Sequence, residues 1–310
     1  MDSLNVCAGI DAGSYESKLA YSDSLSTRII ARLPGFDMNA LREEAEAFFD
    51  EPVFSCVVAL HGGRRVSAGA SGFNDVETIT ASEALCLVVK GKALVYDLGA
   101  SGCRMFMLAD GALIESDAVD DVSGNEFDRR FAEYLAERFR VEAVDVSEAR
   151  RIKHELSERE GTTWHEVRIL REELERLIHF PVKRTARILH RMAKVHSPDT
   201  VIVTGGSVKI PCVMRTLAEV LGFLPEYRGN VIAEGAAFRA REQQKGGRQT
   251  QKADTSSRLR ELRAGVISLE DKLTRRQKDR LYAMFRQAEG INDAGIIALM
   301  EKLIREIRSA

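Results

Sequence analysis

The start of the chain shows the alternation of apolar and polar positions that is typical of β-strands. In residues 5–21 (NVCAGIDAGSYESKLAY) an alternating run ends at Asp11, a turn of small residues follows, and a second apolar run begins near Leu19. Two short strands joined by a glycine-containing turn predict a β-hairpin.

The same pattern recurs in residues 92–108 (KALVYDLGASGCRMFML), where an apolar run ends at Asp97 and another follows a turn of small residues. This repetition predicts two related half-domains. Each turn carries backbone N–H groups with little side-chain cover, which can cradle phosphate. Each also carries one carboxylate, Asp11 or Asp97, which can help to hold a hydrated divalent cation.

A third glycine turn completes the set. Residues 204–207 (TGGS) follow a buried strand at residues 201–203 and precede a helix that has Pro211 in its first turn. Gly205 and Gly206 have no Cβ, so the backbone there can approach a base or a ribose closely.

Helical signals follow the second hairpin. Ser123 and Glu126 form a capping box that opens one helix, and Asp145 caps the next. Residues 162–195 have the periodicity of a long helical region, which we expect to break at Pro181.

The last part of the chain has a different composition. Residues 244–257 are polar, contain glycine and lack large apolar side chains, which predicts a flexible linker. Apolar stripes over residues 269–288 and 296–307 predict a helical hairpin within residues 258–310. Two short helices are rarely stable alone, so we expect them to pack on the preceding domain, on a second copy or on a client.

Composition narrows the classes of function. The chain has 310 residues, 45% hydrophobic residues and a formal net charge of −2, without an apolar run long enough to span a membrane or an N-terminal signal, so a cytoplasmic protein is expected. The five cysteines are scattered and without a CxxC pair, which favours reduced thiols. Residues 248–310 carry more basic than acidic residues, but they contain only two aromatic residues, Tyr282 and Phe285, as candidates for base stacking, which argues against nucleic acid as a partner.

The motifs together resemble those of the ATPase domain of the seventy-kilodalton heat-shock chaperones, within the actin-like superfamily. The resemblance covers residues 4–243. It rests on two phosphate motifs, an adenosine motif and three helices, whose sequences here are IDAGSYESKLA, VYDLGASGCRMFML, IVTGGSVKIP, VSGNEFDRRFAEYLAERF, ARRIKHELS and GNVIAEGAAFRA.

The resemblance implies an α/β fold with two lobes and duplicated half-domains that begin with β-hairpins, followed by the helical hairpin. We expect residues 1–118 to form the first lobe with both phosphate hairpins, and residues 119–243 to form the second lobe with the adenosine motif. Residues 244–257 would be the linker and residues 258–310 the C-terminal helical region.

The same resemblance implies ATP or ADP and Mg²⁺ as ligands between the lobes. Asp11 and Asp97 would be the catalytic residues and would hold the Mg²⁺ through water molecules. The residues implied to bind the nucleotide are Gly13, Ser14, Gly99, Ala100 and Ser101 for the phosphates, Lys153 and Ser157 for the ribose, His154 for the adenine, and Gly205, Gly206, Ser207 and Lys209 in the adenosine turn.

The chain departs from the family pattern at several points. A residue with a hydroxyl group is replaced by Gly102 and an acidic residue by Arg104, and the family has a proline where this chain has Leu60-His61. No segment corresponds to the subdomain that carries the family's water-positioning lysine, although Lys18 and Arg64 are chemically able to reach a phosphate. We therefore expect nucleotide binding to survive better than turnover.

Three functions remain open at this point. The favoured one is an ATP-binding, chaperone-like protein with slow or no hydrolysis, whose C-terminal helices contact a protein partner or client. Those helices do not resemble the β-sandwich with which the family grips peptides. The alternatives are a non-catalytic actin-like scaffold or assembly protein, and a small-molecule kinase on the same fold.

Overall fold

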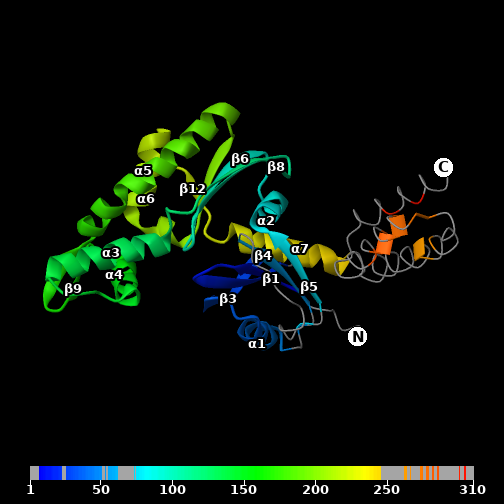
Figure 1. Cartoon of the computed structure of the whole chain (residues 1–310), viewed down its shortest axis with the longest axis horizontal. Helices are drawn as coiled ribbons and strands as arrows, with labels where there is room; N and C mark the ends of the chain where they lie inside the picture. The colour runs from blue at the N-terminus through cyan, green and yellow to red at the C-terminus, as the bar shows by residue number, and fades with distance from the viewer. Residues whose placement is uncertain are drawn as a thin grey trace. The chain divides into compact units, whose positions relative to one another are not determined.

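The computed structural model describes residues 7–22, 26–50, 55–61 and 75–245, the single residues Val53 and Phe73, and scattered residues between 262 and 304. The chain divides into two compact units, Met1–Glu242 and Gln243–Ala310. The first unit contains two five-stranded sheets with helices against them (Figure 1).

The first sheet begins with the predicted hairpin. Its strand order is β3-β2-β1-β4-β5, in which β1 pairs antiparallel with β2 and parallel with β4. Helix α1 packs on one face of this sheet. The elements are β1 (Cys7–Ala12), β2 (Glu16–Ser22), β3 (Thr27–Pro34), α1 (Met38–Phe49), β4 (Ser55–Leu60) and β5 (Asp75–Thr80).

The second sheet has the strand order β12-β11-β6-β7-β8 and contains both the second hairpin and the strand before the third glycine turn. Strand β6 pairs in parallel with β11, and this register sets Asp97 opposite Thr204. The strands are β6 (Lys92–Leu98), β7 (Cys103–Ala109), β8 (Ala112–Val119), β11 (Thr200–Thr204) and β12 (Glu226–Tyr227).

This pairing differs from the predicted lobe boundary at residue 118. The two hairpins do not share a sheet, because β6, β7 and β8 join β11 instead of the strands of residues 7–60. The first sheet is built from strands between residues 7 and 80, and the second sheet, which contains the second hairpin, from strands between residues 92 and 227. Sequence alternation shows where strands lie and does not show which distant strands pair.

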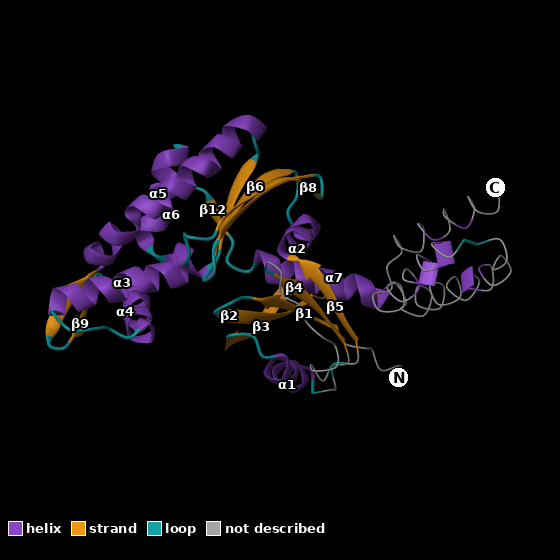
Figure 2. Cartoon of the chain, in the orientation of Figure 1, coloured by secondary structure: helices purple, strands orange, loops and turns teal. Residues whose placement is uncertain are grey.

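The helices fill the space around the second sheet and between the two sheets (Figure 2). Ser123 and Asp145 cap their helices as predicted, since each side chain accepts a hydrogen bond from the first turn. The remaining helices are α2 (Ala81–Val88), α3 (Gly124–Phe139), α4 (Val146–Glu158), α5 (Arg171–His196), the 3₁₀ turn η2 (Gly206–Lys209), α6 (Pro211–Leu221) and α7 (Val231–Lys245).

The predicted helical region of residues 162–195 is wrong in two respects. Its first part is a small hairpin of β9 (Gly161–Trp164) and β10 (Val167–Leu170), turned by His165 and Glu166 at φ values of 46° and 63°. Two successive residues with positive φ are the signature of a type I′ hairpin turn. The second part, α5, continues through Pro181 without a break.

Alternation along the strands divides the apolar core into three layers. One face of the first sheet packs on α1, and one face of the second packs on the helices α3 to α6. The inner faces of both sheets share a third cluster with α2 and α7. Its members include Cys7 and Val57 from the first sheet, Val95 and Ile202 from the second, Leu85 from α2 and Val231 from α7.

Helix α7 packs with no clearance inside this third cluster. A Cβ added at Gly235 would lie 2.1 Å from the carbonyl oxygen of Ala84 in α2, and one added at Gly9 of β1 would lie 2.1 Å from the backbone nitrogen of Ala237. Real Cβ contacts are never this short, so both glycines are needed for the backbones to meet. The contact between α7 and α2 at Gly235 is therefore a close backbone-to-backbone contact.

The predicted helical hairpin of residues 258–310 falls mostly outside the described residues. Where the chain is described, Thr274 and Gln277 form a capping motif, with Gln277 Oε1 accepting from the Thr274 backbone at 2.9 Å. Leu273 is buried and lies before this helix start instead of inside a longer helix.

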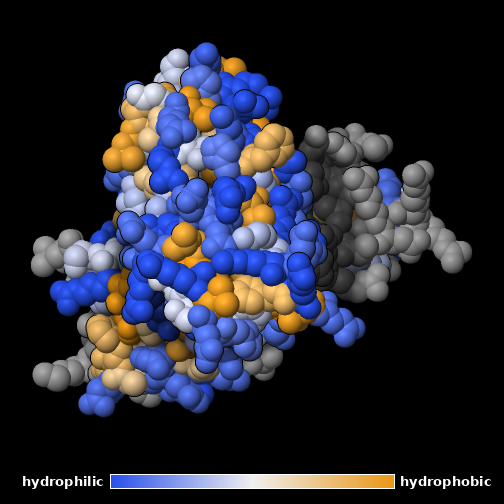
Figure 3. Space-filling model, turned by 90° about the vertical axis from the view of Figure 1, so that its left-hand side faces the viewer, coloured by the Kyte–Doolittle hydropathy of each residue, from blue (hydrophilic) through white to orange (hydrophobic). Residues whose placement is uncertain are grey.

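In the described part of the chain, every helix is too short or too polar to cross a bilayer. The face of the molecule in Figure 3 is mostly hydrophilic, and its apolar residues are dispersed in small groups.

Candidate functional site

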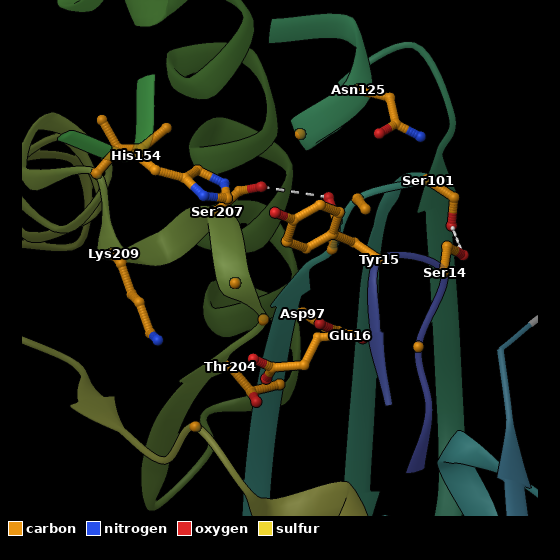
Figure 4. Close-up of a pocket in the computed structure, with 18 of the residues that line it drawn as sticks. Ser14, Tyr15, Glu16, Asp97, Ser101, Asn125, His154, Thr204, Ser207 and Lys209 are labelled. Carbon is orange, nitrogen blue, oxygen red and sulfur yellow. Dashed lines mark hydrogen bonds between the residues drawn. The ribbon is translucent and has the colours of Figure 1, made fainter. Parts of the chain in front are cut away.

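The structure brings all fourteen predicted site residues to one cavity of about 450 Å³ within the first unit (Figure 4). They reach it from the turns after β1, β6 and β11 and from helix α4. The predicted residues that line the cavity are Asp11, Gly13, Ser14, Asp97, Gly99, Ala100, Ser101, Lys153, His154, Ser157, Gly205, Gly206, Ser207 and Lys209.

The two hairpin turns face each other at one side of the cavity. Ser14 Oγ donates to Ser101 Oγ at 3.1 Å, which joins the turns of two different sheets. The backbone N–H groups of Ser14, Ala100 and Ser101 have no acceptor among the described residues. Unpaired amides of this kind form a concave surface that suits an anion.

The start of α3 holds the second turn in place. The backbone N–H groups of Gly124 and Asn125 donate to the carbonyl oxygens of Gly99 and Ala100, both at 2.9 Å. A Cβ at Gly124 would lie 2.6 Å from Ser207 Oγ, so the helix start also lies directly against the third turn. The turn conformation is thus fixed by neighbouring backbone before any ligand arrives.

Two buried carboxylates lie at the centre of the cavity. Asp11 and Asp97 expose only 4% and 5% of their surface. Lys18 Nζ lies 3.1 Å from Asp11 Oδ2, and His61 Nε2 lies 2.6 Å from Asp11 Oδ1. The other ring nitrogen of His61, Nδ1, lies 3.6 Å from Asp97 Oδ2. The histidine therefore bridges the two carboxylates.

The pKa values reflect this pairing. Burial by itself would raise the pKa of Asp11, but Lys18 and His61 hold it well below its usual range. Burial by itself would lower the pKa of His61. The negative charges of Asp11 and Asp97 have the larger effect and raise this pKa to about 9. Burial raises the pKa of Asp97, and the negative charge of Asp11 adds to this rise, while the charge of His61 opposes it.

A second charged cluster lies where the ribose is expected. Lys153 Nζ lies 2.5 Å from Asp128 Oδ1, and Arg150 Nε lies 2.7 Å from Asp128 Oδ2. Lys153 also donates to the carbonyl oxygen of Gly124 at 3.2 Å. These contacts tie α4 to α3 and hold the Lys153 ammonium at the cavity wall, while its contact with a ribose stays a prediction.

His154 lies across the cavity from the two hairpin turns. Its ring meets the ring of Tyr15 edge to face at 5.3 Å, and the Arg150 guanidinium lies 5.2 Å from the Tyr15 ring. Burial, together with the charge of Lys153, lowers the pKa of His154, so the imidazole is neutral near pH 7. A neutral ring is able to stack on a base.

Tyr15 was not among the predicted site residues. Figure 4 shows its ring extending from the first turn toward His154. Its position directly after the Gly13-Ser14 turn was the signal in the sequence, because a side chain there must project from the phosphate loop.

The third turn closes the floor of the site. Gly205 has φ +97°, and a Cβ there would lie 2.3 Å from the carbonyl oxygen of Leu98 and 2.7 Å from Asp97 Oδ1. Ser207 Oγ donates to the carbonyl oxygen of Gly99 at 3.4 Å. Lys209 and His154 lie on the side of the cavity opposite Ser14 and Ser101 (Figure 4).

The departures from the family pattern have defined structural consequences. Arg104 pairs with the exposed Asp120 at 2.6 Å and lies so close to Gly102 that a Cβ there would be 2.5 Å from its Nη1. Lys18 pairs with Asp11 in the β1–β2 register, so the hairpin pattern itself contained the signal for this contact. Arg64 lies outside the described residues.

The side chains as they stand do not fit the predicted Mg²⁺. Both oxygens of Asp11 are already paired with Lys18 and His61, which leaves no free oxygen to orient the water shell of a cation. In the described part of the chain, no group of three or more His, Cys, Asp or Glu side chains is placed to hold a metal ion.

The two sheets, their shared inner helices and the cavity lined by three turns define the class of protein, a two-lobed α/β fold of the actin-like ATPase type. No model of a protein family matches the chain. Comparison with individual proteins is more specific, and it finds chaperones of the heat-shock protein 70 type.

Among these relatives is the Chaperone protein DnaK of Thermosipho melanesiensis, 26% identical in an alignment of 261 residues that covers 67% of this chain and 44% of the relative. The Chaperone protein dnaK3 of Synechococcus elongatus is 27% identical, covering 66% of this chain and 34% of the relative. The Mitochondrial-type heat shock protein 70 of Encephalitozoon cuniculi is 26% identical, covering 67% and 44%.

The predicted resemblance to the ATPase domain of the heat-shock protein 70 family is thus confirmed over about two thirds of the chain. The chain spans less than half the length of these relatives.

The buried charge cluster gives a prediction about stability. Asp128→Ala leaves Arg150 and Lys153 without their carboxylate, and removing one member of a buried ion pair costs about 3 kcal/mol or more. For a chain of this size that corresponds to a fall in Tm of roughly 6–12 °C. Asp121→Ala, which breaks an exposed pair with Arg184, is the control and should change Tm little. Equal Tm values for the two variants in thermal denaturation would contradict this assignment.

Proposed function

We propose that this chain is a chaperone-type protein that binds ATP or ADP in the cavity of its first unit and hydrolyses ATP slowly or not at all. The observation that carries the proposal is the convergence of three glycine turns, from two sheets, on one cavity where the amides of Ser14, Ala100 and Ser101 have no acceptor in the described chain. The similarity to heat-shock protein 70 chaperones supports the chaperone class.

The cavity suits an adenine nucleotide in size and in the distribution of its polar groups. Its volume of about 450 Å³ lies within the range of small-molecule sites, roughly 300–1,000 Å³. The amides of Ser14, Ala100 and Ser101 would receive the phosphates, and His154 and Lys209 would face the base at the opposite side. Between these two ends, the Gly205 backbone lies directly against Leu98 and Asp97.

The first test of the proposal is nucleotide binding by the full chain. ATP or ADP at about 100 times its Kd should stabilise the folded protein by about 2.7 kcal/mol. This corresponds to a rise in Tm of roughly 5–11 °C, measurable by differential scanning fluorimetry. Gly205→Val should abolish the shift, because its side chain would collide with Leu98 and Asp97. Gly222→Val is the control for backbone strain, because Gly222 also has a positive φ but has open space around it.

An unchanged Tm of the wild-type protein with either nucleotide at millimolar concentration would overturn the proposal.

The second test concerns turnover. Gly102 offers no hydroxyl group, and Arg104 is directed toward Asp120 at the position where the family pattern has an acidic residue. Losing one well-placed transition-state contact typically costs about 10²–10³ in rate. From a typical enzyme kcat of about 10 s⁻¹, we expect about 0.01–0.1 s⁻¹ or less in a phosphate-release assay. Turnover of several per second that Asp97→Asn abolishes would show that the site is catalytically complete.

The C-terminal region is proposed to contact a protein partner or client. All the described cavity residues lie between Asp11 and Ile232, within the first unit. Deleting residues 244–310 should therefore leave the Kd for ADP unchanged within about twofold and alter oligomeric state or partner binding, as measured by titration calorimetry and light scattering. Loss of ADP binding by a truncated protein that remains folded would assign the tail to the nucleotide site instead.

A further inference from the structure

His61 occupies a position between two carboxylates that come from different sheets. It follows the end of β4, the strand next to β1, and its ring reaches Asp11 at 2.6 Å and Asp97 at 3.6 Å. Nε2 lies at hydrogen-bond distance from Asp11, and Nδ1 faces Asp97 at the longer distance of an ion pair, so both ring nitrogens lie beside a carboxylate, which favours the protonated imidazolium.

Lys18 completes the set from the other side of Asp11. Its Nζ lies 3.1 Å from Asp11 Oδ2, and its side chain is only 14% exposed. The register of the β1–β2 hairpin sets Lys18 directly opposite Asp11, so the contact is built into the sheet and does not depend on a loop. Each oxygen of Asp11 therefore has its own cation.

The charges balance without a metal ion. Asp11 and Asp97 contribute two negative charges. Lys18 and protonated His61 together contribute two positive charges, which equals the charge of one divalent cation. Two converging buried carboxylates require such compensation, because unpaired like charges at short distance in a buried site are costly. The chain supplies it with side chains.

We propose that His61 and Lys18 together take the place of the divalent cation in this cleft, so that the Asp11–Asp97 pair binds no metal and phosphate groups bind in the cleft without Mg²⁺. The proposal rests on the proposed function for its ligand, an adenine nucleotide. Its central part, that the carboxylate pair is closed to metals, concerns this chain's own residues and can be tested without a nucleotide.

The donor groups of the cavity agree with this arrangement. The amides of Ser14, Ala100 and Ser101 offer neutral donors to phosphate oxygens, and the cations of Lys18 and His61 lie beside them in the same cavity. Charge-assisted hydrogen bonds from an ammonium or an imidazolium are about twice as strong as neutral ones. The Lys18 ammonium has three N–H donors and uses one of them on Asp11, so it can still donate to a phosphate directly, without a bridging ion.

The first experiment titrates the nucleotide-free, full-length protein with Mn²⁺ and follows free Mn²⁺ by electron paramagnetic resonance. The wild-type protein should take up no Mn²⁺ at this site up to millimolar concentrations. His61→Ala removes the side chain between Asp11 and Asp97, and this variant should bind one Mn²⁺ at least tenfold more tightly than the wild-type protein does. His179→Ala, an exposed histidine on α5 away from both carboxylates, should behave as the wild type.

Two outcomes of this titration would overturn the proposal. One is wild-type uptake of Mn²⁺ below millimolar concentration that Asp97→Ala removes. The other is a folded His61→Ala protein whose Mn²⁺ uptake equals that of the wild type. If His61→Ala does not fold, His61→Asn replaces it, because asparagine keeps one N–H donor for Asp11 and carries no charge.

The second experiment measures ATP and ADP affinity by calorimetry in Mg²⁺ and in EDTA. Wild-type Kd values should agree within about threefold, and the folded His61 variant should bind at least tenfold more weakly in EDTA than in Mg²⁺. A wild-type Kd that rises tenfold or more in EDTA would overturn metal-free binding. Absence of nucleotide binding in every condition would refute the proposed function, while the Mn²⁺ titration would still decide whether His61 closes the carboxylate pair.

Discussion

The electrostatic pairing around Asp11 and Asp97 is the interaction on which the rest of the site depends. Each carboxylate lies near the end of a strand in a different sheet, and both are buried. Bringing two negative charges together out of water is unfavourable unless cations accompany them. His61 lies between them and compensates the charge, and the hydrogen bond between Ser14 and Ser101 joins the two hairpin turns at the phosphate side of the cavity.

Much of this site could be predicted from the sequence because its signals are local. An apolar run that ends at Asp-x-Gly marks a strand and its turn wherever it occurs, and Gly205 marks a backbone that must come close to its neighbour. The sheet partners could not be predicted in the same way. The pairing of β6 with β11 joins residues about a hundred positions apart, and nothing in either strand's alternation identifies its partner.

The remaining differences have similar causes. The hairpin of β9 and β10 could not be predicted from the sequence, because its strands have only four residues each. Over so few residues, the apolar periodicity of a strand cannot be distinguished from that of the helix that follows. His61 was visible only as a departure from a family pattern, since its role depends on a third strand lying next to β1. The contact of Lys18 with Asp11 is easier to predict, because the register of the two-stranded hairpin alone sets the two residues opposite each other.

The close backbone packing of α7 against β1 and α2 has a mechanical consequence. This helix touches the backbone of β1 through Gly9 and the backbone of α2 through its own Gly235, and its first turn packs with residues of both sheets. Densely packed contacts of this kind transmit displacement instead of absorbing it. A change in the angle between the sheets must therefore rotate or shift α7 as a rigid rod. Because α7 runs without interruption to Lys245, that displacement is carried along the whole length of the helix.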